Sequence, residues 1–188
     1  MASIQTLSDA DRRVLARWAA ACAERVLPLF DADADAGAVR EIRDAVERTR
    51  RYSRGDSSAA DEIGKRMVAV KAAKAATTAA GAAAARSVAQ AAAVAHMGAH
   101  ALGAAAYATK AVSLASGGRP GAVAEEIRWQ LGQLSDRERA ALRLLPPLGA
   151  DSSGPLCEGL LSRGILGATI REIQVDVGST PTLTPGVA

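Results

Sequence analysis

The chain has 188 residues, of which 49% are hydrophobic and 23% charged, and its formal net charge is +3. These values predict one soluble globular domain with enough chain to bury a core. The two cysteines, Cys22 and Cys157, exclude a disulfide framework, and the mild basicity permits a nucleic acid or an acidic partner without requiring either.

The hydrophobic content comes largely from alanine, because aromatic residues make up only 3% of the chain. Alanine is the best helix former and a poor strand former. We therefore expect an all-α fold, a single-domain bundle of about five to seven helices around a long Ala-rich central helix. The N-terminus lacks a charged-then-apolar leader, so we expect a cytoplasmic protein with reduced thiols.

Helical spacing predicts the first elements. In residues 7–31, Ser8 is placed as an N-cap with Asp11 three positions on, and Pro28 is expected to end or kink the helix. Residues 38–56 predict an amphipathic surface helix that Gly55 stops. A third helix should start near Ser57 or Ser58. The residues expected to point inward from it are Ile63, Met67 and Val70.

Residues 81–116 predict the long central helix. No charged residue lies between Arg86 and Lys110, which is long enough to cross a bilayer. The segment is mostly Ala and Gly rather than the larger residues that drive membrane insertion, so we expect it to be buried in the protein.

Two short helices should follow at about 121–133 and 136–145, the second with Ser135 and Glu138 as a capping box. We place a helical domain at 1–145 and a partly disordered C-terminal extension at 146–188. In this extension, alternating Ile173, Val175 and Val177 suit a short strand, which would need a pairing partner.

Both histidines, His96 and His100, lie four residues apart in the Ala-rich segment, so a continuous helix would place them on one face. A zinc site would need a third ligand, and the Glu of the H-E-x-x-H pattern is replaced by Met97. We favour hydrogen-bonded structural histidines over a metal site. A role in binding a partner stays open, because imidazole can both donate and accept hydrogen bonds.

The densest positive cluster surrounds Tyr52 and consists of Arg48, Arg50, Arg51 and Arg54. It could contact RNA or an acidic partner, but we favour the solvated end of a helix, where cations complement the macrodipole. The sequence contains no nucleophile elbow and no phosphate-binding Gly-rich loop, so we expect neither catalysis nor a cofactor.

Two blocks resemble a known family. The segments LARWAAACAERVLPLF and AHMGAHALGAAAYATKA are similar to the all-helical "immunity protein five-like" group of bacterial polymorphic toxin systems. The resemblance spans roughly residues 8–132, and Tyr52 departs from the family pattern, which has Trp there. The matching positions are Trp18, Cys22, Glu24, Arg25, Pro28, Phe30, Arg50, Gly55, Asp56, His96, His100, Tyr107 and Lys110.

The resemblance implies a non-catalytic protein that neutralises a cognate bacterial toxin by binding it. The expected binding residues are Trp18, Arg25, His96, His100, Tyr107 and Lys110, with the polar ones in or beside one inter-helical groove. The alternative is a helical protein, including an enzyme, that binds a metal or small ligand through His96 and His100. We expect no membrane contact and do not favour nucleic acid, and a homodimer stays open.

Overall fold

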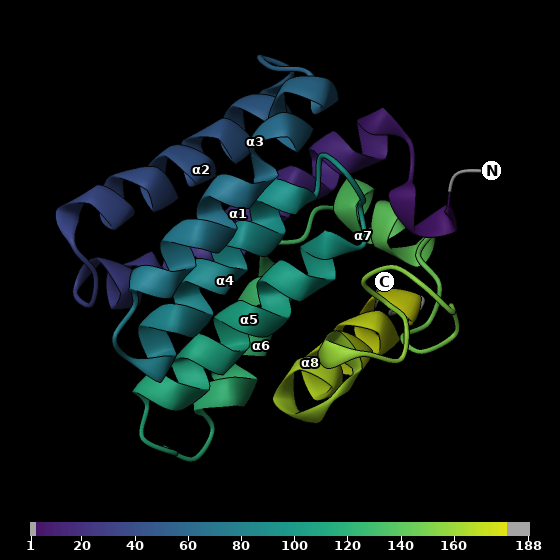
Figure 1. Ribbon diagram of the computed structural model, residues 1–188. Helices are drawn as coiled ribbons and strands as arrows, with labels where there is room; N and C mark the ends of the chain where they lie inside the picture. Colours follow the sequence, from purple (N-terminus) through teal and green to yellow (C-terminus); the bar gives the residue numbers. More distant parts are fainter. Residues whose placement is uncertain (1–2, 180–188) are drawn as a thin grey trace, which may run out of the picture.

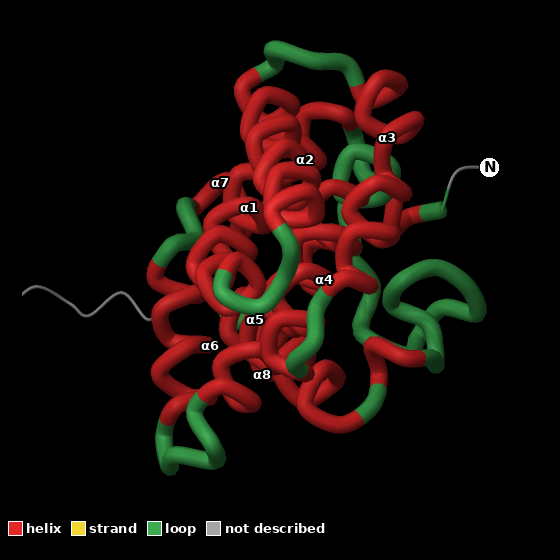
Figure 2. Tube along the Cα trace, turned by 60° about the vertical axis from the view of Figure 1, so that its left-hand side comes forward, coloured by secondary structure: helices red, strands yellow, loops and turns green. Residues whose placement is uncertain are grey.

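The computed structural model describes residues 3–179, which form eight α-helices, three short 3₁₀-helices and no strand (Figures 1 and 2). The α-helices are α1 (Asp9–Asp31), α2 (Ala36–Arg54), α3 (Ala59–Ala72), α4 (Ala79–Ala93), α5 (His100–Ala115), α6 (Ala122–Gly132), α7 (Asp136–Arg143) and α8 (Gly164–Gly178). The 3₁₀-helices are η1 (Ile4–Thr6), η2 (Ala73–Ala75) and η3 (Leu160–Ser162). The predicted all-α bundle is confirmed. Its helix count exceeds the expected range because the Ala-rich segment splits in two and the C-terminal extension adds α8.

Helix α1 is the centre of the bundle and packs against α2, α4 and α5 (Figure 1). Its predicted cap is confirmed, since the Ser8 side chain accepts a hydrogen bond from the Asp11 amide. Of the two outcomes predicted at Pro28, an end or a kink, the end is wrong, because the helix continues to Asp31. Pro28 lies in the last turn and removes only one helical hydrogen bond, while Phe30 beyond it is fully buried and holds that turn in the core.

Helices α2 and α3 form a pair that covers one side of α1 and α4. Gly55 ends α2 in the left-handed conformation with a φ of 89°, as predicted, and Ser58 caps α3 with a capping box. The expectation that Met67 and Val70 point inward is wrong, since they are 49% and 41% exposed. The small Ala69 and Ala72 face the core instead, because the helices approach closely there.

The predicted continuous helix over 81–116 is wrong, because α4 and α5 form an antiparallel hairpin joined by a turn at 94–99. Ser87 near the middle of α4 donates to the Ala104 carbonyl at 2.7 Å across the hairpin. Alanine faces let the two backbones approach closely, so the hairpin fills the core with few large side chains. The segment is buried as expected, but as two helices.

The break in the Ala-rich segment is held by the N-terminal turn η1. The Gly98 amide donates to Thr6 O and the Ala99 amide to Gln5 O, each at 3.1 Å. A Cβ on Gly98 would lie 2.7 Å from Leu7 Cδ1, so a larger residue there would force the Leu7 side chain to shift. A long-range contact therefore ends α4 where helix propensity alone would continue it.

Helices α6 and α7 confirm the two predicted short helices, including the Ser135 and Glu138 capping box. The strand predicted at Ile173, Val175 and Val177 is wrong, because these residues lie in α8. Ile173 and Val177 lie one helical turn apart and are buried, while Val175 between them is 70% exposed. The apolar residues of this segment therefore follow the period of a helix and not the alternation of a strand.

Helix α8 packs against α5 and α7, so residues 146–179 lie on the same core as the preceding helices. A domain boundary after residue 145 stays a prediction. The predicted disorder at the end of the extension falls on residues 180–188, outside the described residues.

We predict that Gln5→Leu lowers the free energy of unfolding by about 2–3 kcal/mol, because it leaves buried polar groups without partners. Gln5 is fully buried, and its side chain donates to Asp151 Oδ2 and Ser153 O and accepts from the Leu156 amide. Urea unfolding of both proteins measures the change. Gln133→Leu, at a half-exposed glutamine of α6's end, is the control and should shift stability by less than about 0.5 kcal/mol.

We predict from the Asp33 carboxylate, which lies between α1 and α2, that the protein becomes less stable in acid. Hydrogen bonds from the Thr77 side chain and the Thr78 amide, at the start of α4, hold the pKa of Asp33 below its ordinary 3.8. Its stabilising contribution is therefore present above that ordinary value and is lost as the pH falls through the lower folded-state pKa. Thermal unfolding midpoints below pH 4 should depend less on pH in Asp33→Asn than in the wild type. An identical pH dependence of the two proteins would contradict this prediction.

Candidate functional site

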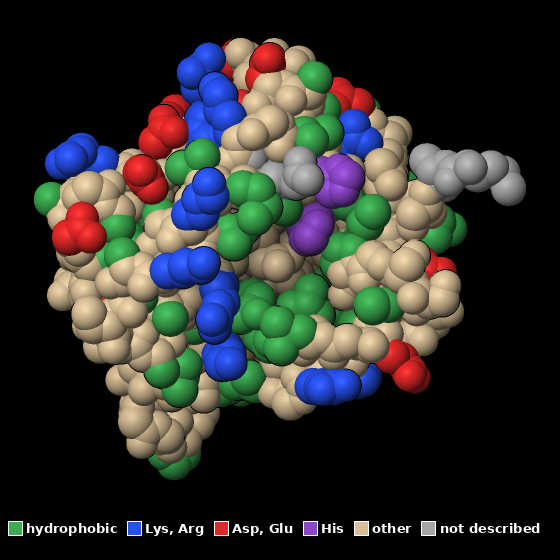
Figure 3. Space-filling view, viewed as in Figure 1, with side chains coloured by type: hydrophobic (Ala, Val, Ile, Leu, Met, Phe, Trp, Pro, Cys, Tyr) green, Lys and Arg blue, Asp and Glu red, His purple; other side chains and the backbone are tan. Residues whose placement is uncertain are grey.

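A hollow of about 420 Å³ opens where the turn between α4 and α5 faces the loop that leads into η3. We call it the histidine hollow. Figure 3 shows the two histidines at its rim, an apolar surface beside them and a column of Lys and Arg side chains along the other side. Its lining residues are Gln90, His96, Met97, His100, Tyr107, Gly154, Pro155, Cys157, Gly159, Leu160 and Leu161.

The two histidines do not share a helix face as the sequence predicted. His96 lies in the turn before α5 and is exposed, whereas His100 is the first residue of α5 and is partly buried. His100 Nδ1 lies 2.8 Å from Gln90 Oε1, and since an amide oxygen only accepts, the imidazole donates. The expected hydrogen bond to a structural histidine is therefore found for His100.

Tyr107, which lies on α5, lines the bottom of the histidine hollow. It is almost fully buried, and this burial raises the pKa of its phenol, while the positive charge of Arg86 opposes the rise. Lys110 follows Tyr107 by three positions, so it continues the same face of the helix and is partly exposed.

A second hollow of about 320 Å³, the cationic hollow, adjoins the first. It is lined by Val70, Ala73, Lys74, Arg86, Ala89, Gln90 and Tyr107. Because Gln90 and Tyr107 line both hollows, the two form one continuous depression over α4 and α5.

The far wall of the histidine hollow is held by Gln5, whose side chain bonds the loop at residues 151–156. Gly154 in this loop has a φ of 81°, and a Cβ there would lie 2.8 Å from Gln5 Oε1. The same residue thus ties the N-terminal turn, the break before α5 and the opposite wall together.

Arg25 and Trp18 lie away from the histidine hollow. Arg25 bonds Glu126 at 2.7 Å, stacks over the Trp129 ring and lines a different hollow between α1, α5 and α6. Trp18 has no exposed surface, and its indole donates to the Gln130 carbonyl at 2.9 Å. The structure therefore brings His96, His100 and Tyr107 together, with Lys110 beside them, but not Arg25 or Trp18.

The arginine cluster of α2 is largely neutralised by carboxylates. Arg48 bonds Asp44 and Glu62, Arg50 bonds Glu24, and Arg54 bonds Glu47 and Asp56. Tyr52 at its centre is buried and donates to Asp9 at 2.9 Å. The carboxylates speak against a nucleic-acid surface, but the predicted solvated helix end holds only for the exposed Arg51 and Arg54, since Arg48 and Tyr52 are buried.

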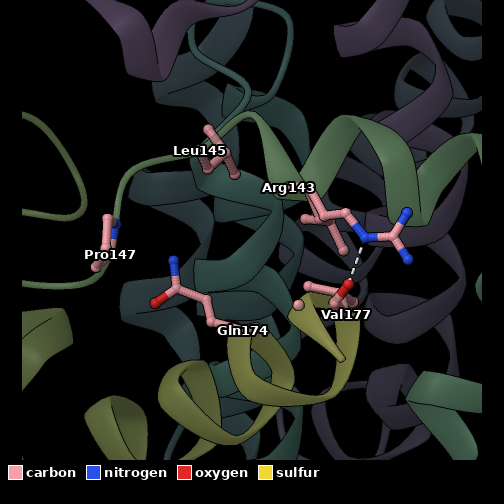
Figure 4. Close-up of a pocket in the computed structure, with 7 residues that line it drawn as sticks. Arg143, Leu145, Pro147, Gln174 and Val177 are labelled. Carbon is pink, nitrogen blue, oxygen red and sulfur yellow. Dashed lines mark hydrogen bonds between the residues drawn. The ribbon is translucent and has the colours of Figure 1, made fainter. Parts of the chain in front are cut away.

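Another hollow, of about 310 Å³, lies between the end of α7 and α8 (Figure 4). Arg143 donates to the Val177 carbonyl, and the Gln174 side chain bonds Pro146 O and the Leu148 amide. The polar groups around this hollow hold α8 to the preceding linker, which makes it a structural joint.

Within residues 3–179 no three His, Cys, Asp or Glu side chains lie close enough together to hold a metal ion. In the same described part, no helix is long and apolar enough to cross a membrane. Sequence analysis missed Gln90, Lys74, Arg86 and Leu160 as lining residues. Their approach depends on the hairpin and on the loop, which local sequence does not reveal.

We predict that Gly103→Ala displaces Gln90 and breaks its bond to His100. A Cβ at position 103 would collide with Gln90 Oε1 and lie 3.2 Å from Leu161 Cδ1. The side-chain NMR signals of His100 should shift while those of His96 stay in place. Gly64→Ala in α3, where a Cβ meets nothing within 4 Å, is the control and should stabilise the protein by about 0.5–1 kcal/mol. Unchanged His100 signals in Gly103→Ala would contradict the prediction.

Comparison with known proteins identifies the family. No curated protein and no solved structure matches the chain. The sequence profile of the family "Imm-5 like putative immunity protein" matches residues 5–137, which include α1 to α6, the start of α7, both histidines and the cationic hollow. Since the match covers well over half of the sequence, the chain belongs to this Imm-5 like family.

Proposed function

We propose that this protein neutralises a toxin of a bacterial polymorphic toxin system by binding it, without catalysis. Membership of the Imm-5 like family supports a toxin as the partner. The observation that supports a binding site is the histidine hollow, an open depression in which polar and apolar groups lie side by side.

The proposed mechanism is occlusion, in which the hollow takes a projecting segment of the toxin. Leu160, which is 68% exposed at the rim, and Met97 supply apolar surface for a buried anchor. His96, on the exposed turn, supplies a polar group that can donate or accept a hydrogen bond. A few such central contacts are enough to provide most of the affinity of a protein complex.

The proposal needs no reactive group. Cys22 is fully buried in α1, and burial raises the pKa of its thiol well above its ordinary value, which makes it a poor nucleophile. We further propose that the protein acts in the bacterial cytoplasm, where two unpaired cysteines such as Cys22 and Cys157 are common.

We expect a toxin-domain protein to be encoded next to this gene, and the test uses that protein. Coexpression with the immunity protein should restore growth of cells that produce the toxin, and the purified proteins should form a complex by calorimetry. A toxin that kills equally in the presence and absence of this protein would contradict the proposal.

We predict that Leu160→Asp weakens this complex at least tenfold, about 1.4 kcal/mol, because it places a charge where the apolar anchor would be desolvated. The matched control is Val175→Asp, since Val175 is 70% exposed on α8 and lines neither hollow. The control should bind like the wild type. Equal affinities of the two variants would place the interface elsewhere.

A further inference from the structure

The depression over α4 and α5 has a one-sided charge. Residues 63–124 contain no Asp or Glu, and their basic residues are Lys65, Arg66, Lys71, Lys74, Arg86, Lys110 and Arg119. This stretch supplies the hairpin and the cationic hollow. The cationic hollow therefore receives positive charge from Lys74 of η2 and Arg86 of α4, and neither element contains a carboxylate. Lys110 of α5 lines neither hollow.

The cations at this depression differ from most arginines of the chain. Arg17, Arg25, Arg50 and Arg139 each bond a carboxylate on another helix. Lys74, Arg86 and Lys110 bond none within the part of the chain that the structure describes. They are thus available to a negatively charged group from outside.

The lining residues of both hollows include no Asp or Glu. The nearest acid along the loop, Glu158, lines a separate hollow with Arg163 and Arg171. Val70 lines the cationic hollow with Lys74 and Arg86, Leu160 lines the histidine hollow, and both leave apolar surface exposed. Positive charge and apolar surface therefore lie side by side at the two adjoining hollows.

We propose that the segment of the partner protein that enters this depression is acidic, with apolar side chains between its carboxylates. The carboxylates would lie against Lys74 and Arg86, which line the cationic hollow, and an apolar side chain would enter the histidine hollow beside Leu160. This inference rests on the proposed function and specifies the chemistry of the partner at the same site.

An acidic protein segment fits this surface better than a nucleic acid does. The exposed apolar residues are aliphatic, and Tyr107, the one Phe, Tyr or Trp among the lining residues, is buried, which leaves His96 as the exposed ring. Single-stranded nucleic acids bind through exposed aromatic rings on which bases stack, together with a continuous basic track. Aliphatic anchors beside a few cations are instead what an acidic, partly apolar peptide needs.

The experiment measures fluorescence anisotropy with three labelled probes and the full chain. They are a decapeptide that alternates glutamate with leucine, one that alternates lysine with leucine, and a decathymidine oligonucleotide. We expect the wild type to prefer the glutamate peptide and Lys74→Glu/Arg86→Glu to bind it at least about tenfold more weakly at low salt. The control Lys65→Glu/Arg137→Glu makes the same change in net charge at positions that line neither hollow. It should bind within about twofold of the wild type.

Three outcomes would overturn the inference. These are equal binding of both peptides by the wild type, stronger binding of the oligonucleotide, and equal losses in the two double variants. Far-ultraviolet circular dichroism confirms that each variant is folded. With the toxin, a Lys74→Glu/Arg86→Glu variant that still protects cells fully would refute the acidic partner while leaving the proposed function intact. Failure of the wild type to protect would refute the proposed function itself.

Discussion

The side chain of Gln5 is the constraint on which the arrangement of the histidine hollow depends. A buried amide must satisfy its donors and acceptor, because an unpaired polar group in the core costs stability. The Gln5 side chain does so by donating to Asp151 and Ser153 and accepting from the Leu156 amide. Its main-chain carbonyl accepts a hydrogen bond from the Ala99 amide. One residue near the N-terminus therefore sets the distance between the turn that carries His96 and the loop that carries Cys157.

The scarcity of large side chains explains why buried hydrogen bonds such as those of Gln5 are needed to hold the elements together. Alanine faces allow α1, α4 and α5 to pack closely, but each alanine buries little apolar area. Specific hydrogen bonds between elements then fix the packing, as in the Ser87 bond across the hairpin and the Gln130 bonds to Ala105 and Thr109. The histidine hollow lies at the turn that joins α4 and α5, where this turn faces the loop that leads into η3.

The sequence predicts the elements whose ends are encoded locally. The caps at Ser8, Ser58 and Ser135 and the stop at Gly55 all mark helix ends correctly. The break at residues 94–99 was not predictable in the same way, because it depends on carbonyls of η1 that are remote in the sequence. The family resemblance identified His96, His100 and Tyr107, which do line one hollow, but the facing loop lies beyond the region it covers.

The charged side chains fall into two groups, those that bond a buried carboxylate and those that bond no carboxylate. Glu126 and Glu138 are buried, so Arg25 and Arg17 must remain beside them, since a buried carboxylate without a partner is strongly destabilising. Lys74, Arg86 and Lys110 bond no carboxylate among the described residues, so they hold no buried acid in place. Changes at Lys74 or Arg86 therefore alter the surface with little effect on the core.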